Sequence, residues 1–209
     1  MRNMTSKIAI AAATAIGGYV LLIERLPAQA GDELARPTHF ESIPDEQKRA
    51  IAIFTEMGKV IQHPRCLNCH PQTDRPSQGD GQHPHMPPVQ RGPDGLGKAA
   101  MACTTCHGED NFSFGGKRGS VPGHEIWHLA PASMAWQGRS LGEICNQITD
   151  PERNGGKSLA DLLKHNAEDG LVGWAWHPGD GRTPAPGSQE GFGALTAAWI
   201  ESGAHCPGD

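Results

Sequence analysis

The sequence is poor in the apolar side chains from which a chain of this length usually builds its core. Only 37% of its 209 residues are hydrophobic, whereas glycine and proline occupy 27 and 17 positions. An ordinary apolar core would therefore be thin, and bound apolar groups would have to supply the missing bulk. We expect the chain to fold poorly without them.

The sequence also lacks an apolar run of the roughly 20 residues that span a membrane. Its main apolar run, Ile8 to Ile23, has sixteen residues, follows a short basic segment and precedes Ala28-Gln29-Ala30. This pattern predicts a signal peptide over residues 1–30 that is removed on export to the periplasm. An uncleaved membrane anchor is the alternative, since Glu24-Arg25 follows the run directly.

The charge balance is acidic. The net charge of -5 becomes -7 when the signal segment is removed, because three basic residues and one acidic residue are lost with it. This balance disfavours nucleic acid as a partner and suits docking on a basic patch of another protein. The remaining 179 residues (209 minus 30) are enough for one domain.

Four of the six cysteines fall in two copies of one pattern. C-x-x-C-H is the signature of covalent haem attachment, in which two thiols bind the porphyrin and the histidine ligates the iron. We therefore predict two covalently attached haem c groups. The thioether residues are Cys66, Cys69, Cys103 and Cys106, and the proximal ligands are His70 and His107.

The alternative for the four thiols is a zinc site. Paired C-x-x-C zinc motifs are usually about 15 to 20 residues apart. Here 33 residues separate Cys69 from Cys103, and zinc gives no reason for a histidine after each pair. The other two cysteines, Cys145 and Cys206, are predicted to form a disulfide in an oxidising compartment; the alternative is a thiolate ligand or a reactive cysteine.

The distal ligands are chosen from several candidates. For the first haem we expect His85, with His83 as the alternative, because both lie just beyond the first motif. For the second haem we expect Met134, which follows a Pro-containing segment, with His128 as the alternative. Methionine ligation would give the second haem the higher potential.

The pattern of apolar residues and capping signals predicts a mainly α fold: one loop-rich dihaem cytochrome c domain over residues 42–209, with about four helices and little or no sheet. Residues 31–41 are expected to form an extended arm. The Pro- and Gly-rich segment 71–98 is expected to wrap over the first haem. The helices are expected at residues 42–61, 140–149, 158–168 and 188–203.

Three segments carry a family resemblance: residues 54–60 (FTEMGKV), 63–71 (HPRCLNCHP) and 129–136 (LAPASMAW). Together they resemble small exported dihaem cytochromes that accompany periplasmic molybdopterin dehydrogenases of the isoquinoline 1-oxidoreductase type. The resemblance covers residues 42–207. It implies electron acceptance from such a dehydrogenase and delivery to a respiratory cytochrome or oxidase.

A second functional class is a small dihaem enzyme, either a peroxidase or a sulfur-compound oxidase, with one haem iron open to substrate. His128, Arg118 or Lys117 would then act as a distal acid or an anion clamp. Because both motifs have candidate distal ligands in a small domain, we predict electron transfer rather than catalysis.

Overall fold

The computed structural model describes residues 33–115 and 119–208. The predicted signal peptide, together with Lys117 and Arg118, lies outside the described residues. Among the residues that are described, no helix has both the length and the apolar character needed to cross a membrane.

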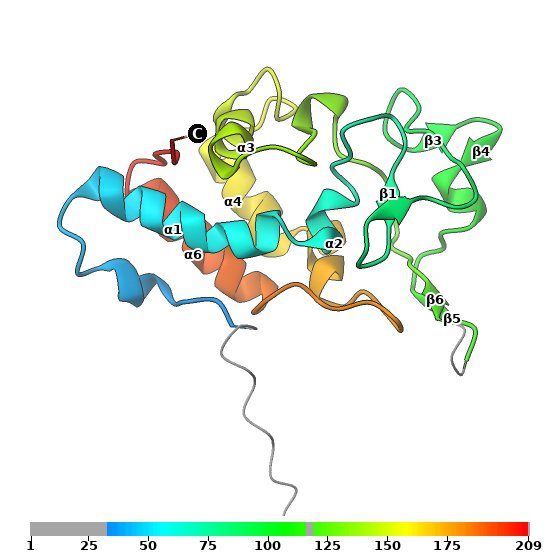
Figure 1. Ribbon diagram of the computed structural model, residues 1–209, viewed down its shortest axis with the longest axis horizontal. Helices are drawn as coiled ribbons and strands as arrows, with labels where there is room; N and C mark the ends of the chain where they lie inside the picture. Colours follow the sequence, from blue (N-terminus) through cyan, green and yellow to red (C-terminus); the bar gives the residue numbers. More distant parts are fainter. Residues whose placement is uncertain (1–32, 116–118, 209) are drawn as a thin grey trace, which may run out of the picture.

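The described chain has a helical half and a loop-rich half (Figure 1). Four helices of nine or more residues form the helical half, which confirms the mainly α prediction. They are α1 (Glu46–Ile61), α3 (Leu141–Thr149), α4 (Leu159–Glu168) and α6 (Gln189–Glu201). The single-turn helices are α2 (Pro64–Leu67) and α5 (Gly170–Gly173), and the 3-10 turns include η1 (Pro37–Phe40), η2 (Cys103–Thr105), η4 (Ala132–Met134) and η5 (Trp174–Trp176).

The strands of the loop-rich half are two residues long and pair as three antiparallel ladders. This agrees with the expected near absence of sheet. The pairs are β1 (Ser77–Gln78) with β2 (His83–Pro84), β3 (Gly97–Lys98) with β4 (Met101–Ala102), and β5 (Phe112–Ser113) with β6 (Ser120–Val121).

Three helix starts follow the predicted capping signals. Ser140 and Glu143 form a capping box at α3, and Ser158 and Asp161 form another at α4. The hydroxyl of Ser188 caps α6. Each cap satisfies backbone N–H groups that the first turn of a helix leaves without partners.

Two predictions near the N-terminal side are wrong. The N-cap of helix α1 is Asp45, three residues after the expected Ser42, and its carboxylate accepts a hydrogen bond from the Lys48 N–H at 2.9 Å. The expected extended arm contains the 3-10 turn η1, whose Phe40 packs into the core. Burial of the Phe40 ring stabilises this turn, and local sequence patterns do not predict that burial.

The core lies where α1 crosses α6. The Phe54 and Trp199 rings are 5.1 Å apart between these helices, which lie side by side in Figure 1. Helix α4 contributes Leu162 to the core, whereas its first residue, Leu159, is 38% exposed. The predicted disulfide is confirmed, and it joins Cys145 of α3 to Cys206 in the tail after α6.

The close approach of α4 and α6 gives a stability prediction. A Cβ built on Gly193 would lie 2.7 Å from the Ala167 Cβ and 3.0 Å from its Cα, which cannot move without moving the helix. Gly193→Ala is therefore expected to lower the free energy of unfolding by about 1 to 3 kcal/mol. Urea unfolding of the purified protein measures this. Gly191→Ala on the same helix meets only Ser188 Oγ at 3.4 Å and is the control, expected to be neutral or stabilising.

Candidate functional site

Both C-x-x-C-H motifs fold as the same helical turn. In the first, which begins in α2, the His70 N–H donates to the Cys66 carbonyl at 3.1 Å. In the second, which begins in η2, the His107 N–H donates to the Cys103 carbonyl at 3.0 Å. Residues three and four apart on such a turn lie on one side of the backbone. Each motif therefore presents two thiols and one imidazole together.

The His70 ring is held by a carbonyl and by an aromatic neighbour. Its Nδ1 lies 2.7 Å from the Met134 carbonyl oxygen. Because a carbonyl only accepts, Nδ1 carries the hydrogen and Nε2 keeps its lone pair. Trp136 stacks on the ring with the centroids 3.4 Å apart and the planes 8° from parallel. The imidazole is thus fixed in one tautomer, with Nε2 able to ligate a metal.

The His107 ring is held in the same way. Its Nδ1 donates to the Pro122 carbonyl at 2.7 Å, and Trp127 stacks on it at 4.8 Å with an interplanar angle of 10°. Trp127 in turn meets Trp174 edge to face at 4.9 Å. Trp127 and Trp136 belong to one short stretch, residues 127–136, which therefore orients both histidines.

Burial keeps the first motif uncharged. It raises the pKa of the Cys66 thiol to about 12 and that of Cys69 to about 11, and it lowers the pKa of His70 to about 3. Burial also lowers the pKa of His107. A neutral imidazole is the form that ligates iron, because protonation would occupy the nitrogen lone pair.

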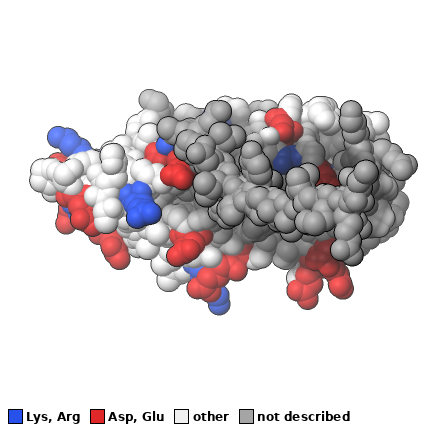
Figure 2. Space-filling view, turned by 90° about the horizontal axis from the view of Figure 1, so that it is seen from below, with Lys and Arg blue, Asp and Glu red and all other residues white. Residues whose placement is uncertain are grey.

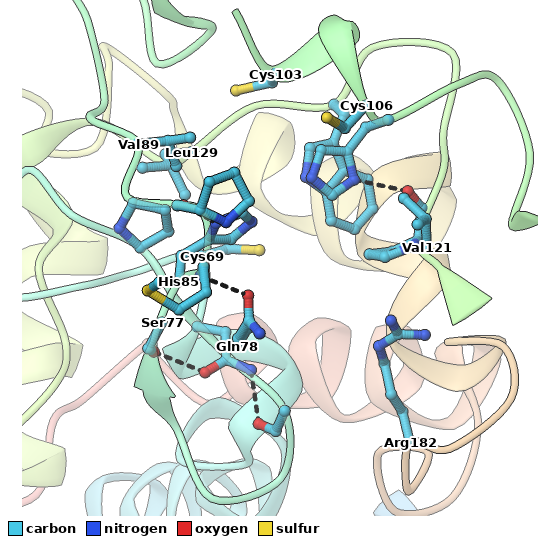
Figure 3. A pocket seen from close by; sticks show the side chains of 18 of the residues that line it. Cys69, Ser77, Gln78, His85, Val89, Cys103, Cys106, Val121, Leu129 and Arg182 are labelled. Atoms are coloured by element: carbon cyan, nitrogen blue, oxygen red, sulfur yellow. Dashed lines mark hydrogen bonds between the residues drawn. The ribbon is translucent and has the colours of Figure 1, made fainter. Parts of the chain in front are cut away.

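Cys69 of the first motif and Cys103, Cys106 and His107 of the second line one cavity of about 490 Å³, within the usual range for ligand sites, whereas Cys66 and His70 are not among its lining residues. Figure 3 shows Cys69 on one side of this space and Cys103 and Cys106 on the other. Apolar side chains from the wrap and from the segment after the second motif form much of the wall. The walls include Pro76, Pro87, Val89, Met101, Val121, Pro122, Trp127, Leu129 and Trp174.

Three arginines, Arg65, Arg91 and Arg182, line the same cavity. Arg65 and Arg91 are 3% and 6% exposed, and the Nε atom of each is buried without a hydrogen-bond partner. Burial lowers the pKa of Arg182, and the charge of Arg65 lowers it further. Buried cations with donor atoms to spare are costly unless an anion joins them. The cavity therefore suits a flat apolar ligand that carries carboxylates, which describes haem.

Arg182 is the arginine with the least compensation. The partners that the structure gives it are neutral: the Ser120 hydroxyl at 2.7 Å, the Ser120 carbonyl and the Pro178 carbonyl at 3.0 Å. Arg65 pairs with Asp80, and Arg91 lies 3.6 Å from Asp74. In Figure 3 the guanidinium of Arg182 points into the cavity toward Val121.

The candidate distal ligands are dispersed. His83, His85 and His128 line the cavity. Met134 does not: it is 6% exposed, packs in the helical core, and its carbonyl holds His70 of the first motif. It lies beside the first motif, whereas the sequence predicts it as a ligand of the second haem. Backbone bonds from Ala130 to Cys69 and from Trp136 to His70 fix the whole segment there.

The sequence patterns do not indicate the stacking of Trp127 and Trp136 on the two histidines. Sequence reasoning also missed Arg65, Arg91 and Arg182. Only Arg65 carries a local signal, because it directly precedes Cys66. The other two reach the cavity through long-range folding.

The zinc alternative finds no support in this geometry. Within residues 33–115 and 119–208, no three His, Cys, Asp or Glu side chains converge in a way that would hold a metal ion by themselves. Haem iron needs only axial ligands from the protein, because the porphyrin supplies the other four.

Comparisons with known proteins add no assignment. The chain matches no protein-family model, and neither the curated proteins nor the solved structures gave a match.

Proposed function

We propose that this chain is a periplasmic dihaem c-type cytochrome that passes electrons between protein partners. The cysteines of each C-x-x-C-H motif would hold one haem c covalently. The observation that carries the proposal is the repeated geometry of the motifs. Each turn groups two thiols with an imidazole whose Nδ1–H donates to a carbonyl, so that Nε2 is left for iron.

The roles of the chain's own residues follow from the two motif turns and from the cavity. The bound haems supply one-electron oxidation and reduction at iron. His70 and His107 ligate from their Nε2 atoms, Trp136 and Trp127 keep those rings in place, and Arg182 offers its guanidinium to a carboxylate. The apolar walls exclude water from the site.

The partners are proposed from the sequence. The resemblance implies a molybdopterin dehydrogenase as donor and a respiratory cytochrome or oxidase as acceptor, and the signal segment implies a periplasmic site. Acidic side chains gather in several groups on the described part of the face in Figure 2, with single basic residues between them. Together with the net charge of -5, they favour a partner with a basic docking surface.

Haem stoichiometry tests the proposal. The full chain is expressed in a host with cytochrome maturation, and its haem is counted by the pyridine haemochrome assay. We expect two haems per chain and a two-electron reductive titration. A colourless product, or one with a single haem, would overturn the proposal. Sustained peroxide turnover by the dihaem protein would instead favour the enzyme alternative.

A charge substitution in the cavity should shift a reduction potential. Arg182→Gln removes a positive charge beside the second motif. Loss of this charge stabilises the ferric haem, which is the more positive oxidation state, so we expect a lower reduction potential for one haem. Spectroelectrochemical titration measures it. The control is Arg139→Gln, which should leave both potentials unchanged. Arg139 is exposed and pairs at 2.7 Å with Glu143 of α3. Equal potentials for Arg182→Gln and wild type would contradict this role for Arg182.

A further inference from the structure

His85 and His107 face each other across the shared cavity. They belong to different segments: His85 follows β2, and His107 follows η2. Their ring centroids are 6.0 Å apart with an interplanar angle of 54°, and both side chains line the cavity. Figure 3 shows His85 on one side of this space and Cys106 of the second motif on the other.

Both rings are held in the tautomer that suits a metal. The Nδ1 of His85 lies 2.9 Å from the Pro87 carbonyl, and the Nδ1 of His107 lies 2.7 Å from the Pro122 carbonyl. Because carbonyl oxygens only accept, each Nδ1 carries a hydrogen, and each Nε2 is left as a lone-pair donor.

The separation of the rings matches that of two imidazoles on opposite sides of one metal ion. A bond of about 2.0 Å from each nitrogen to the metal, with each nitrogen about 1.1 Å from its ring centre, puts the centroids roughly 6.2 Å apart. The observed 6.0 Å is close to this value.

Hydrogen bonds fix the backbone of His85. Its N–H donates to the Pro76 carbonyl at 3.0 Å, and its carbonyl accepts from Arg75 Nη2 at 3.0 Å. The next N–H, of Met86, donates to Gln78 Oε1 at 3.0 Å. The β1–β2 hairpin therefore fixes the position of His85 beside His107 of the second motif.

The competing candidates are less well placed. Met134 lies in the helical core beside the first motif, and the Met86 side chain is 64% exposed. His83 is exposed, and its ring lies against Gly79. His128 makes the same kind of Nδ1–carbonyl hydrogen bond, to the adjacent Leu129 at 3.0 Å, but the imidazole that lies against the His107 ring is that of His85.

We propose that His85 and His107 are the two axial ligands of the haem attached to Cys103 and Cys106. The inference rests on the proposed function, since it requires that haem. It moves His85 from the first haem, where the sequence placed it, to the second. It also makes the second haem a bis-histidine centre, without the rise in potential that methionine ligation gives.

Spectroscopy of the holoprotein tests the assignment. Low-temperature EPR and near-infrared magnetic circular dichroism distinguish bis-histidine, histidine–methionine and open haems. In the wild type we expect at least one bis-histidine signal. In His85→Ala we expect one low-spin signal to be lost and replaced by high-spin haem, while two haems per chain remain. Added imidazole should restore the lost signal.

Two further variants sharpen the result. His85→Met is expected to give the near-infrared signature of methionine ligation and a higher potential for one haem, so the test does not depend on the alanine variant. His83→Ala, two residues away on the same hairpin, is the matched control and should leave both signals intact.

The failures are distinguishable. Fewer than two haems in the wild type would mean that the proposed function itself fails. Two haems with spectra unchanged by both His85 substitutions, or a loss of the bis-histidine signal in His83→Ala or His128→Ala instead, would overturn the ligand assignment alone.

Discussion

Replacing Cys103 and Cys106 together with alanine is expected to reduce the haem content from two per chain to one. The second motif lies in the loop-rich half, whereas the first follows α1 and its Cys66 packs against the helical core. The helical half should therefore still form and keep its own haem. The pyridine haemochrome assay on purified protein measures the change, and mass spectrometry of the intact chain checks it.

The control for this double variant is Cys145→Ala with Cys206→Ala. It removes two cysteines that form a disulfide and belong to neither motif, so both haems should remain. Stability should nevertheless fall by about 2 to 4 kcal/mol, because the disulfide closes a long loop. Two haems after the loss of Cys103 and Cys106 would show that the second motif does not attach one, and a haem-free product would show that the two sites cannot form separately.

The parts of the fold that the sequence predicted are those with local causes. The capping boxes at Ser140 and Ser158 need only residues three apart, and both form as predicted. The start of α1 differs because two capping side chains, Ser42 and Asp45, compete within one turn. The turn at residues 37–40 depends on the burial of Phe40 against distant helices, which no local pattern reports.

The candidate site divides in the same way. The C-x-x-C-H residues are defined by their spacing, so the sequence alone singles them out, and each motif forms a helical turn. The surroundings of each histidine are set by contacts between distant segments: Met134 holds His70 from 64 residues away, and His85 meets His107 across the cavity. The Pro-containing segment before Met134 led to its prediction as a distal ligand of the second haem, but the backbone of this segment pairs with Cys69 and His70. The order of residues along the chain therefore does not predict which of them lie near which motif.

The distribution of apolar side chains gives the last prediction. Between Ile61 and Leu129 no apolar side chain of the described residues other than Pro71 is buried. Several large ones in this region are exposed instead, Met86, Phe112 and Phe114 among them. Three ladders of two residues each cannot stabilise such a segment. We therefore expect the loop-rich half to depend on bound haem for order.

Haem-free protein, made without cytochrome maturation, is accordingly expected to lose structure in this half first. Trypsin should cut after Arg91 and Lys98 at least about tenfold faster than in the holoprotein, which corresponds to a loss of about 1.4 kcal/mol of local stability. Lys59 of α1 and Lys164 of α4 are internal controls, because they lie on helices that pack around the apolar core, and cleavage there should change less. Mass spectrometry of the early fragments gives the order of cleavage. Equal protection of Arg91 and Lys98 with and without haem would mean that the loop-rich half folds by itself, and the cavity would then owe its shape to the polypeptide alone.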